Sequence, residues 1–300
     1  MAIDRVLFFP VTPFTPDDEV DLDRFGDHLA DRLTHRPGAV FAACGTGEFH
    51  TLSVDEHRRL AERAVAVTDG AVPVICGAGG PLGHARACAR SAADAGADGL
   101  LAMPPYLVGA PQQGLVAYVE AIAAVSDLEL VVYHRANAQL TPATVERLFA
   151  NPKVVGVKDG VGDLAIAQQF VLAAAHAGRT GASFFNGLLT AELTQAAYDG
   201  IGVPYYSSAA FAMVPDVATA YLGALRRGDD ELRHQLLEAF YLPLVALRDE
   251  TRGFAVALIK AGVRLEGLDV GPVRPPLVDP DPEQLDRLRR IIDDGRKVLA

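Results

Sequence analysis

A lysine at the end of a short apolar run is the residue with the clearest chemical potential in this sequence. The run 154–157 ends in Lys158, and lysine is otherwise scarce, since only Lys153, Lys260 and Lys297 also occur. A lysine that ends a buried strand has its stem in apolar surroundings and its amine in a cleft. Desolvation there disfavours the ammonium form and frees an amine for imine chemistry. From this run alone a solvated strand-end lysine is the favoured interpretation, and the rest of the chain must supply the evidence for a buried amine.

Polar residues and glycines follow other strand-like runs at the corresponding positions. They are Gly45, Thr46, Gly47 and Glu48 after the second run, Tyr133 and Arg135 at the fifth, Asn186 at the seventh, and Ser207 and Ser208 at the eighth. A Gly-Thr-Gly turn offers backbone amides and a hydroxyl to an anion. Each signal is weak by itself, because strand-to-helix turns often contain such residues.

The elements that must position these residues alternate regularly along the chain. Expected strands cover 5–10, 38–43, 72–77, 98–103, 128–134, 153–158, 181–186 and 201–207, and expected helices begin near residues 21, 53, 81, 112, 141, 163, 188 and 210. Ser53 and Glu56 have the pattern of a capping box, and Thr141-Pro142 that of a cap before a first-turn proline. The strand runs are largely apolar, as expected of parallel strands covered on both faces.

This alternation predicts an α/β fold, a closed (β/α)8 TIM barrel, since the cycles occupy roughly 225 residues and such a barrel typically takes about 250. A doubly wound open sheet is less favoured, because the first strand is not followed by a Gly-x-Gly-x-x-Gly turn. The predicted barrel domain is 1–228. A C-terminal helical extension over 229–300 is expected to pack on it, with helices at 230–249, 251–265 and 281–298 and an extended link at 271–276.

Bulk composition excludes several classes of partner. The chain has 300 residues, is 50% hydrophobic and carries a formal charge of −11, which argues against nucleic acid and anionic membranes as partners. Its three cysteines, Cys44, Cys76 and Cys88, are too few and too irregular for a disulfide framework. Without an N-terminal targeting signal or a long apolar run, a soluble cytoplasmic protein is the expectation.

Several motifs, spread in order over nearly the whole chain, also match a known family. The first set comprises Pro10-Val11-Thr12-Pro13-Phe14, Gly45-Thr46-Gly47-Glu48, Pro104-Pro105-Tyr106, Tyr133 and Lys158. This set resembles the dihydrodipicolinate synthase / N-acetylneuraminate lyase family. A second set comprises Thr46-Gly47-Glu48-Phe49, Arg135-Ala136-Asn137-Ala138, Val157-Lys158-Asp159-Gly160-Val161-Gly162-Asp163, Thr190-Ala191-Glu192, Tyr206-Ser207-Ser208-Ala209 and Gly271-Pro272-Val273-Arg274-Pro275-Pro276-Leu277. It is most similar to the 5-dehydro-4-deoxyglucarate dehydratase branch of that family.

The resemblance implies a role for each of four residues. Lys158 is the expected nucleophile toward a ketone next to a carboxylate, and Tyr133 the expected proton relay. Gly45 and Thr46 are expected to hold the substrate carboxylate. No metal and no organic cofactor is implied, because the Lys158 iminium withdraws the electrons itself, and no cluster with metal-ligand spacing appears at the strand ends.

A glucarate-type substrate is a dicarboxylate, so a second anion site is expected. Arg135 is the candidate, because a guanidinium can hold a carboxylate through two hydrogen bonds. Ser207 and Ser208 are expected to add hydroxyl donors, with Asn186 near them.

Two further residues are expected to be structural. Glu48 should hydrogen-bond its own loop, and His134, which follows Tyr133 on a strand, should point outward from the barrel.

The implied function is a decarboxylating hydro-lyase that converts 5-dehydro-4-deoxy-D-glucarate to 2,5-dioxopentanoate, CO2 and water. Departures from the dehydratase pattern at Cys44, His134, Leu189 and Ala212 leave the substrate open. The alternatives are another class I 2-keto acid aldolase or synthase, and a catalytically silent sugar-acid-binding relative. A barrel phosphate isomerase is disfavoured, because the last two strands lack glycine-rich phosphate loops. The expected partner is a small keto-sugar dicarboxylate, and the resemblance implies a homo-oligomer, commonly a tetramer.

Overall fold

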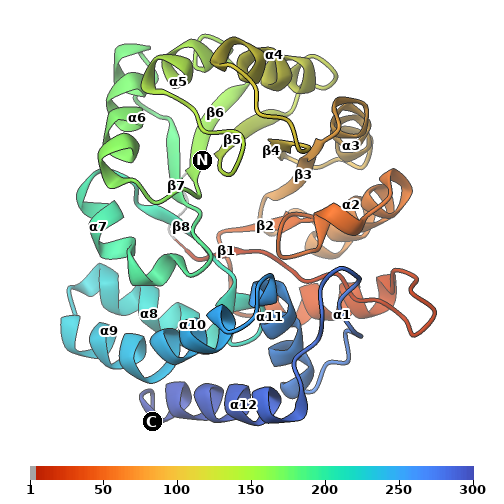
Figure 1. Cartoon of the computed structure of the whole chain (residues 1–300), viewed down its shortest axis with the longest axis vertical. Coiled ribbons are helices and arrows are strands. Elements are labelled where there is room, and N and C mark those ends of the chain that lie inside the picture. Colours follow the sequence, from red (N-terminus) through yellow and green to blue (C-terminus); the bar gives the residue numbers. More distant parts are fainter. Residues whose placement is uncertain (1–4) are drawn as a thin grey trace.

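Eight parallel strands close into a single barrel, in which β1 pairs with both β2 and β8 (Figure 1). The computed structural model describes residues 5–300 of the chain. Its strands are β1 (Leu7–Phe8), β2 (Ala39–Ala42), β3 (Val74–Gly80), β4 (Gly99–Pro105), β5 (Glu129–His134), β6 (Val154–Asp159), β7 (Ser183–Asn186) and β8 (Tyr205–Ser208). The predicted TIM barrel is confirmed. The open-sheet alternative is wrong, because an open sheet would leave its two edge strands unpaired.

Strands β1 and β8 are shortened most relative to the prediction. β1 is confined to Leu7–Phe8 rather than 5–10, and β8 begins at Tyr205 rather than at 201. The backbone N–H groups of Ile201 and Val203 both donate to the carbonyl of Tyr198, so this segment closes the preceding helix instead of extending the strand.

The barrel helices follow the strands in order and surround them (Figure 1). They are α1 (Leu22–Leu33), α2 (Val54–Thr68), α3 (Leu82–Asp94), α4 (Gln112–Ala123), α5 (Pro142–Leu148), α6 (Leu164–His176), α7 (Gln195–Gly200) and α8 (Pro215–Arg227). The capping box of Ser53 and Glu56 is present, and the Thr141 hydroxyl accepts from the backbone N–H of Thr144, so both predicted helix starts are confirmed.

The last two barrel helices begin later than expected. Short 3-10 turns, η2 (Ala191–Leu193) and η3 (Ala210–Ala212), occupy the positions where helices near 188 and 210 were predicted. Pro215 stands in the first turn of α8, where its missing N–H leaves no helical bond unmade. The segment 187–190 is not helical, and its residues line the cavity described below.

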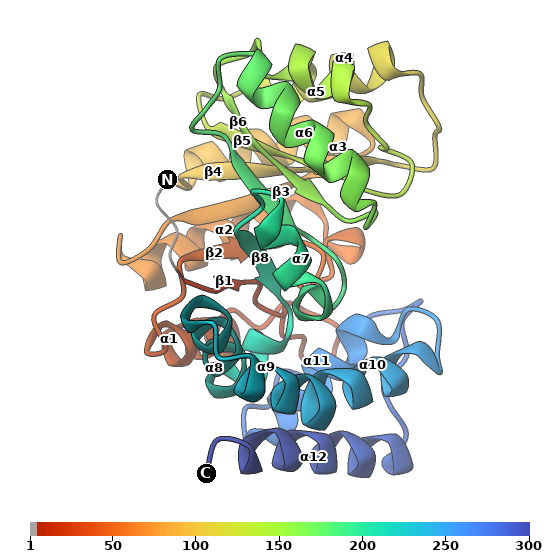
Figure 2. The same cartoon turned by 90° about the vertical axis from the view of Figure 1, so that its left-hand side faces the viewer.

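Four helices follow the barrel and lie together along one side of it (Figure 2). They are α9 (Asp230–Leu236), α10 (Leu242–Asp249), α11 (Phe254–Leu265) and α12 (Pro282–Lys297). The predicted single helix 230–249 is interrupted by the π-helical turn η4 (Leu237–Tyr241). Pro243 explains the widening, because it has no N–H to donate to the carbonyl of Ala239.

The interior contains two hydrophobic clusters. A smaller one fills the barrel lumen, where Phe9, Phe41, Leu101, Tyr133 and Phe185 meet. The larger one lies between the strands and the helices, and it includes buried residues of α10, α11 and α12. The boundary between barrel and extension at 228 stays a prediction, because the extension and the barrel share this second cluster. None of the helices in residues 5–300 is long and apolar enough to cross a membrane.

Candidate active site

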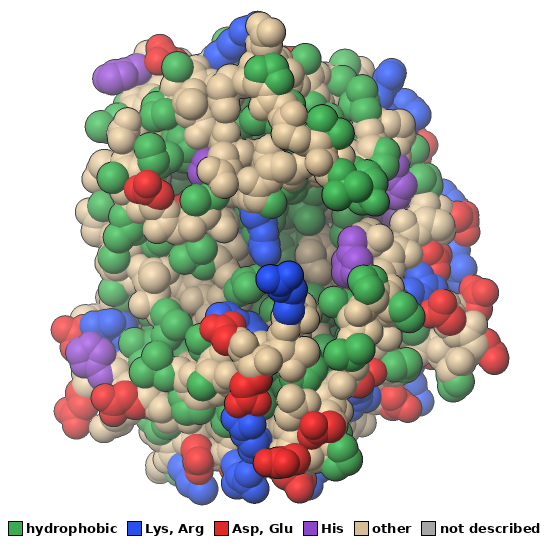
Figure 3. Space-filling model, in the orientation of Figure 1, with side chains coloured by type: hydrophobic (Ala, Val, Ile, Leu, Met, Phe, Trp, Pro, Cys, Tyr) green, Lys and Arg blue, Asp and Glu red, His purple; other side chains and the backbone are tan. Residues whose placement is uncertain are grey.

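The carboxyl ends of the strands open into a cavity of about 340 Å³. Lys158, Tyr133 and Thr46 line it from the barrel, and residues of α10 and α11 line it from the opposite side. Figure 3 shows this face of the molecule hollowed near its centre, with basic side chains at the hollow. The active sites of TIM barrels lie at this end of the strands.

Lys158 points into the lumen because β6 contains a bulge. Leu130 of β5 pairs with Val154, but the next residue, Val131, pairs with Gly156, so Val155 is an extra residue. Val155 packs in the lumen cluster, and strict alternation from there would turn Lys158 outward. The bulge shifts the alternation by one residue and returns Lys158 to the inner face.

The Lys158 amine is enclosed by aromatic rings rather than by water. The side chain is 6% exposed, and its Nζ lies 4.1 Å from the Phe9 ring centroid and 4.5 Å from that of Tyr133. Burial lowers the pKa of this amine, and the charge of Arg135 acts in the same direction, while Tyr133 and Cys44 oppose it. The prediction of a buried strand-end amine in a cleft is confirmed, and the solvated alternative is wrong.

Tyr133 lies beside Lys158, since the two residues are register partners across β5 and β6. The Tyr133 hydroxyl donates to the carbonyl of Gly187 at 2.9 Å and accepts from Arg135 Nη1 at 2.7 Å. A phenol held between a donor and an acceptor at the edge of the cavity is placed to pass protons to an adduct on the neighbouring amine.

Gly45 and Thr46 line the cavity on the turn that follows β2. Glu48, which ends this turn, has the left-handed φ of 57° and is fully buried. Its Oε1 accepts from Lys260 Nζ at 2.8 Å and its Oε2 from the backbone N–H of Arg274 at 2.8 Å. Glu48 does not line the cavity, so the structural role predicted for it is confirmed. The predicted partner is wrong, because its carboxylate bonds Lys260 and Arg274 of the C-terminal segment rather than its own loop.

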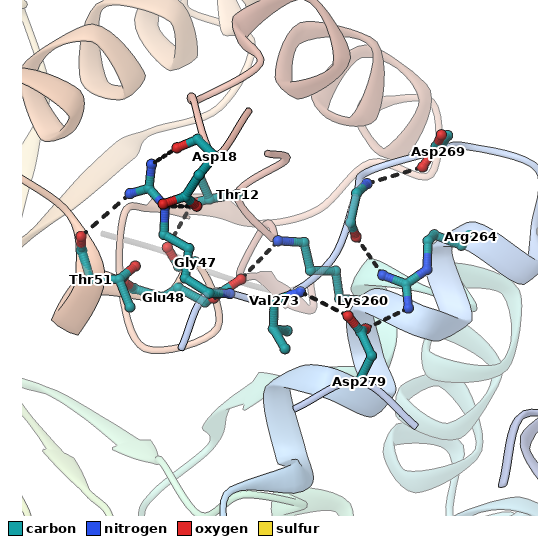
Figure 4. A network of polar contacts seen from close by, with 12 residues as sticks. Thr12, Asp18, Gly47, Glu48, Thr51, Lys260, Arg264, Asp269, Val273 and Asp279 are labelled. Carbon is teal, nitrogen blue, oxygen red and sulfur yellow. Dashed lines mark hydrogen bonds and ion pairs between the residues drawn. The ribbon is translucent and has the colours of Figure 1, made fainter. Parts of the chain in front are cut away.

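The network around Glu48 connects the turn to the C-terminal segment (Figure 4). Thr12 Oγ1 donates to the carbonyl of Gly47 at 2.6 Å, which secures the turn from the β1 side. Arg264 of α11 pairs with Asp279, and that carboxylate also accepts from the backbone N–H of Val273. The conformation of the candidate anion-binding turn therefore depends on α11 and on the link after it.

Among the remaining predicted residues, Arg135 and Ser207 line the cavity, whereas Asn186 and Ser208 do not. Asn186 is fully buried and donates to the carbonyl of Ala191 and to Thr194 Oγ1. Ser208 donates to Glu192 Oε1 at 2.5 Å. Both residues stand at positions of β7 and β8 whose side chains face the helices, so the expectation that they contact substrate is corrected.

The structure also places residues in the lining that sequence reasoning did not select, among them His50, Thr190, Glu192 and Arg248. Thr190 and Glu192 belong to the Thr190-Ala191-Glu192 motif, so a signal for them existed. Arg248 lies in α10, where an arginine in an amphipathic helix is ordinarily solvated, and no local pattern distinguishes it.

His134 faces away from the lumen, as predicted. Its ring packs edge-on against Phe170 of α6, and its Nδ1 accepts from the backbone N–H of Leu140 at 2.8 Å. Burial lowers the pKa of this histidine, and the charges of Asp159 and Asp163 oppose the shift. His134 is therefore a packing residue on the outer face of β5.

Comparison with known proteins identifies the family of this chain. The model of the Dihydrodipicolinate synthetase family matches residues 2–294. The chain is 53% identical over 296 residues to a protein of Streptomyces griseus subsp. griseus named probable 5-dehydro-4-deoxyglucarate dehydratase, with 98% of this chain and 92% of the relative covered. It is 48% identical to a Streptomyces avermitilis protein named probable 5-dehydro-4-deoxyglucarate dehydratase 1, with 98% and 94% covered.

Solved structures agree on the fold. The crystal structure of dihydrodipicolinate synthase from Oceanobacillus iheyensis superposes with a TM-score of 0.89 at 24% identity, covering 98% of this chain and 97% of that one. At this identity the likeness concerns the fold alone, whereas the family match extends over nearly the whole sequence. The chain belongs to the dihydrodipicolinate synthetase family.

Proposed function

We propose that this chain is a class I lyase that converts 5-dehydro-4-deoxy-D-glucarate to 2,5-dioxopentanoate, CO2 and water. The observation that carries the proposal is the Lys158 amine, buried beside the Tyr133 phenol on the wall of the cavity. The names of the relatives support the choice of substrate, because they are about half identical to this chain over most of its length.

The chemistry begins at the substrate ketone. Lys158 Nζ attacks C5, and loss of water from the carbinolamine gives an iminium. Burial favours the free amine that this attack requires, since it lowers the lysine pKa. Tyr133 passes protons to and from the carbinolamine oxygen and C4. Removal of a C4 proton converts the iminium to an enamine.

Elimination and decarboxylation follow from the same electron sink. The enamine electrons expel the protonated C3 hydroxyl as water, which leaves a C3=C4 double bond conjugated with the iminium. When the C1–C2 bond breaks, its electrons enter this conjugated system and CO2 departs. Proton uptake at C3 and C4, with loss of the proton from the C2 hydroxyl, gives the aldehyde and restores the iminium. Hydrolysis of the iminium releases 2,5-dioxopentanoate and the free amine.

The remaining residues of the cavity bind rather than react in this proposal. Gly45 and Thr46 hold the carboxylate next to the ketone through amide and hydroxyl donors. Ser207 offers a hydroxyl to the substrate chain, and Arg135 holds the Tyr133 hydroxyl at the reacting end of the cavity. The iminium supplies the electron withdrawal, so the proposed reaction uses no metal and no organic cofactor. A homo-oligomer and a cytoplasmic location stay predictions.

The test is a panel of keto-sugar acids assayed with wild type and Lys158→Ala. CO2 release from 5-dehydro-4-deoxy-D-glucarate supports the proposal, whereas pyruvate release from 2-keto-3-deoxy sugar acids would assign an aldolase instead. Borohydride reduction with pyruvate should add mass irreversibly at Lys158 in wild type. Wild-type turnover by Lys158→Ala would refute the assignment of the nucleophile.

A further inference from the structure

Arg248 is the one charged side chain that the C-terminal helices contribute to the cavity lining within residues 5–300. The other lining residues from this segment are apolar, namely Leu244, Ala255, Val256, Leu258, Ile259 and Leu277. Its side chain is 16% exposed, so the guanidinium lies largely out of solvent. A cation on an otherwise apolar wall, facing the strand ends across the cavity, indicates a ligand with a negative group at that end.

The Arg248 guanidinium is already held in position. Nη1 donates to Thr190 Oγ1 at 2.8 Å, and Nε and Nη2 donate to the two carboxylate oxygens of Asp249 at 2.7 and 3.1 Å. An arginine has five N–H donors. One donor on Nη1 and one on Nη2 therefore remain for a ligand, on a group whose orientation is fixed before the ligand arrives.

Arg135, the other guanidinium in the lining, belongs to the reacting end of the cavity. Its Nη1 donates to the Tyr133 hydroxyl, and its charge contributes to the lowered pKa of Lys158. A carboxylate bound to Arg135 would lie beside the phenol that must accept and return protons. The carboxylate next to the ketone already has Gly45 and Thr46 as its proposed ligands, so the distal carboxylate requires a separate anchor.

We propose that Arg248, positioned by Thr190 and Asp249, binds the distal carboxylate of the substrate and makes the cavity selective for keto acids with two carboxylates. This inference rests on the proposed function for the identity of that carboxylate, which is the one lost as CO2. A two-point contact fixes the position of the C1 carboxylate and thereby the torsion about C2–C3, so the breaking C1–C2 bond can be held perpendicular to the conjugated system.

Asp249 compensates the charge of Arg248 when the distal carboxylate is lost as CO2. When CO2 departs, the negative charge leaves the distal end, and an unpaired guanidinium would remain in a largely buried position. The Asp249 carboxylate already pairs with Arg248, so the cation is neutralised before and after the reaction. The product has lost the group that Arg248 binds, which favours its release.

The test compares two ligands that can form an imine but cannot eliminate water. 2-Oxoadipate has the carbon skeleton of the substrate without its hydroxyls, and 2-oxohexanoate has a methyl in place of the distal carboxylate. Calorimetry of the full-length protein measures both affinities. We expect wild type to prefer the diacid by about 10- to 150-fold, the range for hydrogen bonds to a charged group. Arg248→Gln should abolish that preference while leaving 2-oxohexanoate affinity within about twofold.

Two matched variants decide between the cations. Arg252, four residues further on, is exposed and does not line the cavity, so Arg252→Gln should retain the wild-type preference. Arg135→Gln should also retain it. A preference that survives in Arg248→Gln, or that is lost in Arg135→Gln instead, overturns the inference, as does a wild type without any preference.

The test of the Arg248 site and the test of the proposed reaction can fail independently of each other. Failure of wild type to release CO2 from 5-dehydro-4-deoxy-D-glucarate would refute the proposed reaction. An Arg248-dependent preference for 2-oxoadipate in the same preparation would still establish the carboxylate site. Conversely, CO2 release with normal rates in Arg248→Gln would support the reaction and refute the site.

Discussion

Lys260 Nζ lies 2.8 Å from Glu48 Oε1, and neither side chain is exposed to solvent. The pair joins α11 to the turn that carries Gly45 and Thr46, across 212 residues of sequence. Burial lowers the pKa of Lys260 to about 8, with the charge of Glu48 opposing the shift. A buried ion pair of this kind adds little net stability over an apolar pair, but removing one partner leaves the other charge unpaired.

We therefore predict that Lys260→Met destabilises the protein by about 3–5 kcal/mol, the range for breaking a buried ion pair. Urea unfolding measures the change. Lys297→Met is the control, because Lys297 pairs with Asp294 on the exposed face of α12 and should matter little. The double variant Lys260→Met with Glu48→Gln should recover part of the loss. Equal stabilities of Lys260→Met and wild type would contradict the prediction.

Gly187 packs against the stem of the nucleophile. A Cβ at this position would lie 2.6 Å from both Cγ and Cε of Lys158 and 2.9 Å from the backbone oxygen of Asp159. Gly187→Ala should therefore displace the lysine and slow adduct formation, with a destabilisation of about 1–3 kcal/mol from overpacking. The rate of borohydride-trapped adduct formation with pyruvate is the measurement.

Gly181→Ala serves as the matched control for Gly187→Ala. A Cβ there would meet nothing within 4 Å, and the residue lies just before β7. We expect this variant to form the adduct at the wild-type rate. Adduct formation in Gly187→Ala as fast as in Gly181→Ala would show that the lysine stem tolerates the extra methyl group.

Tyr133→Phe separates proton transfer from imine formation. The phenol accepts from Arg135 and donates to the carbonyl of Gly187, so its loss removes the relay but leaves Lys158 buried. General acid–base catalysis contributes about 100- to 10,000-fold, and we expect kcat to fall within that range. The borohydride adduct should still form. Unchanged turnover by Tyr133→Phe would mean that protons reach the substrate by another route.

Features of the fold and the site could be predicted from the sequence where they depend on residues close together in the chain. The barrel follows from the regular alternation of strands and helices, and the adjacency of Lys158 and Tyr133 from their places at the ends of neighbouring strands. The buried amine and the proton-relay role of Tyr133 were indicated only by the resemblance of the motifs to a known family. The outward orientation of His134 follows from its place after Tyr133 on one strand. Such features require knowledge of one strand and its immediate neighbour only.

Features that depend on register or on packing between distant segments could not be predicted in this way. Asn186 and Ser208 were selected because they end strands, but strand ends alone do not tell which face a side chain occupies. The bulge at Val155 could not be predicted either, because it is visible only in the pairing of β6 with β5. Arg248 reaches the cavity because α10 folds back over the barrel, and nothing in the local sequence indicates that contact.

Glu192 provides a pH-dependent prediction. It is buried and accepts from Ser208 Oγ at 2.5 Å, and burial raises the pKa of its carboxyl to about 7, against the effect of that hydrogen bond. The unfolded chain, with a carboxyl pKa near 4.5, binds fewer protons than the folded one between these two values. The contribution of the neutral Glu192 carboxyl to the free energy of unfolding is therefore fully present below about pH 4.5. It is lost as the pH rises through about 7.

Glu192→Gln removes this titration while keeping an oxygen that can accept from Ser208. Unfolding free energies of wild type and variant, measured from pH 5 to 8, give a difference in which the other titrating groups cancel. That difference should shift in favour of the variant as the pH rises, by up to about 3 kcal/mol, because one pKa unit corresponds to about 1.4 kcal/mol. A pH-independent difference would show that Glu192 ionises in the folded protein as it does in the unfolded chain. A salt-bridged carboxylate would give the opposite change with pH, because its stabilisation is lost as the pH falls. The sign of the change in the unfolding free-energy difference therefore distinguishes a carboxyl kept neutral by burial from one held by a cation.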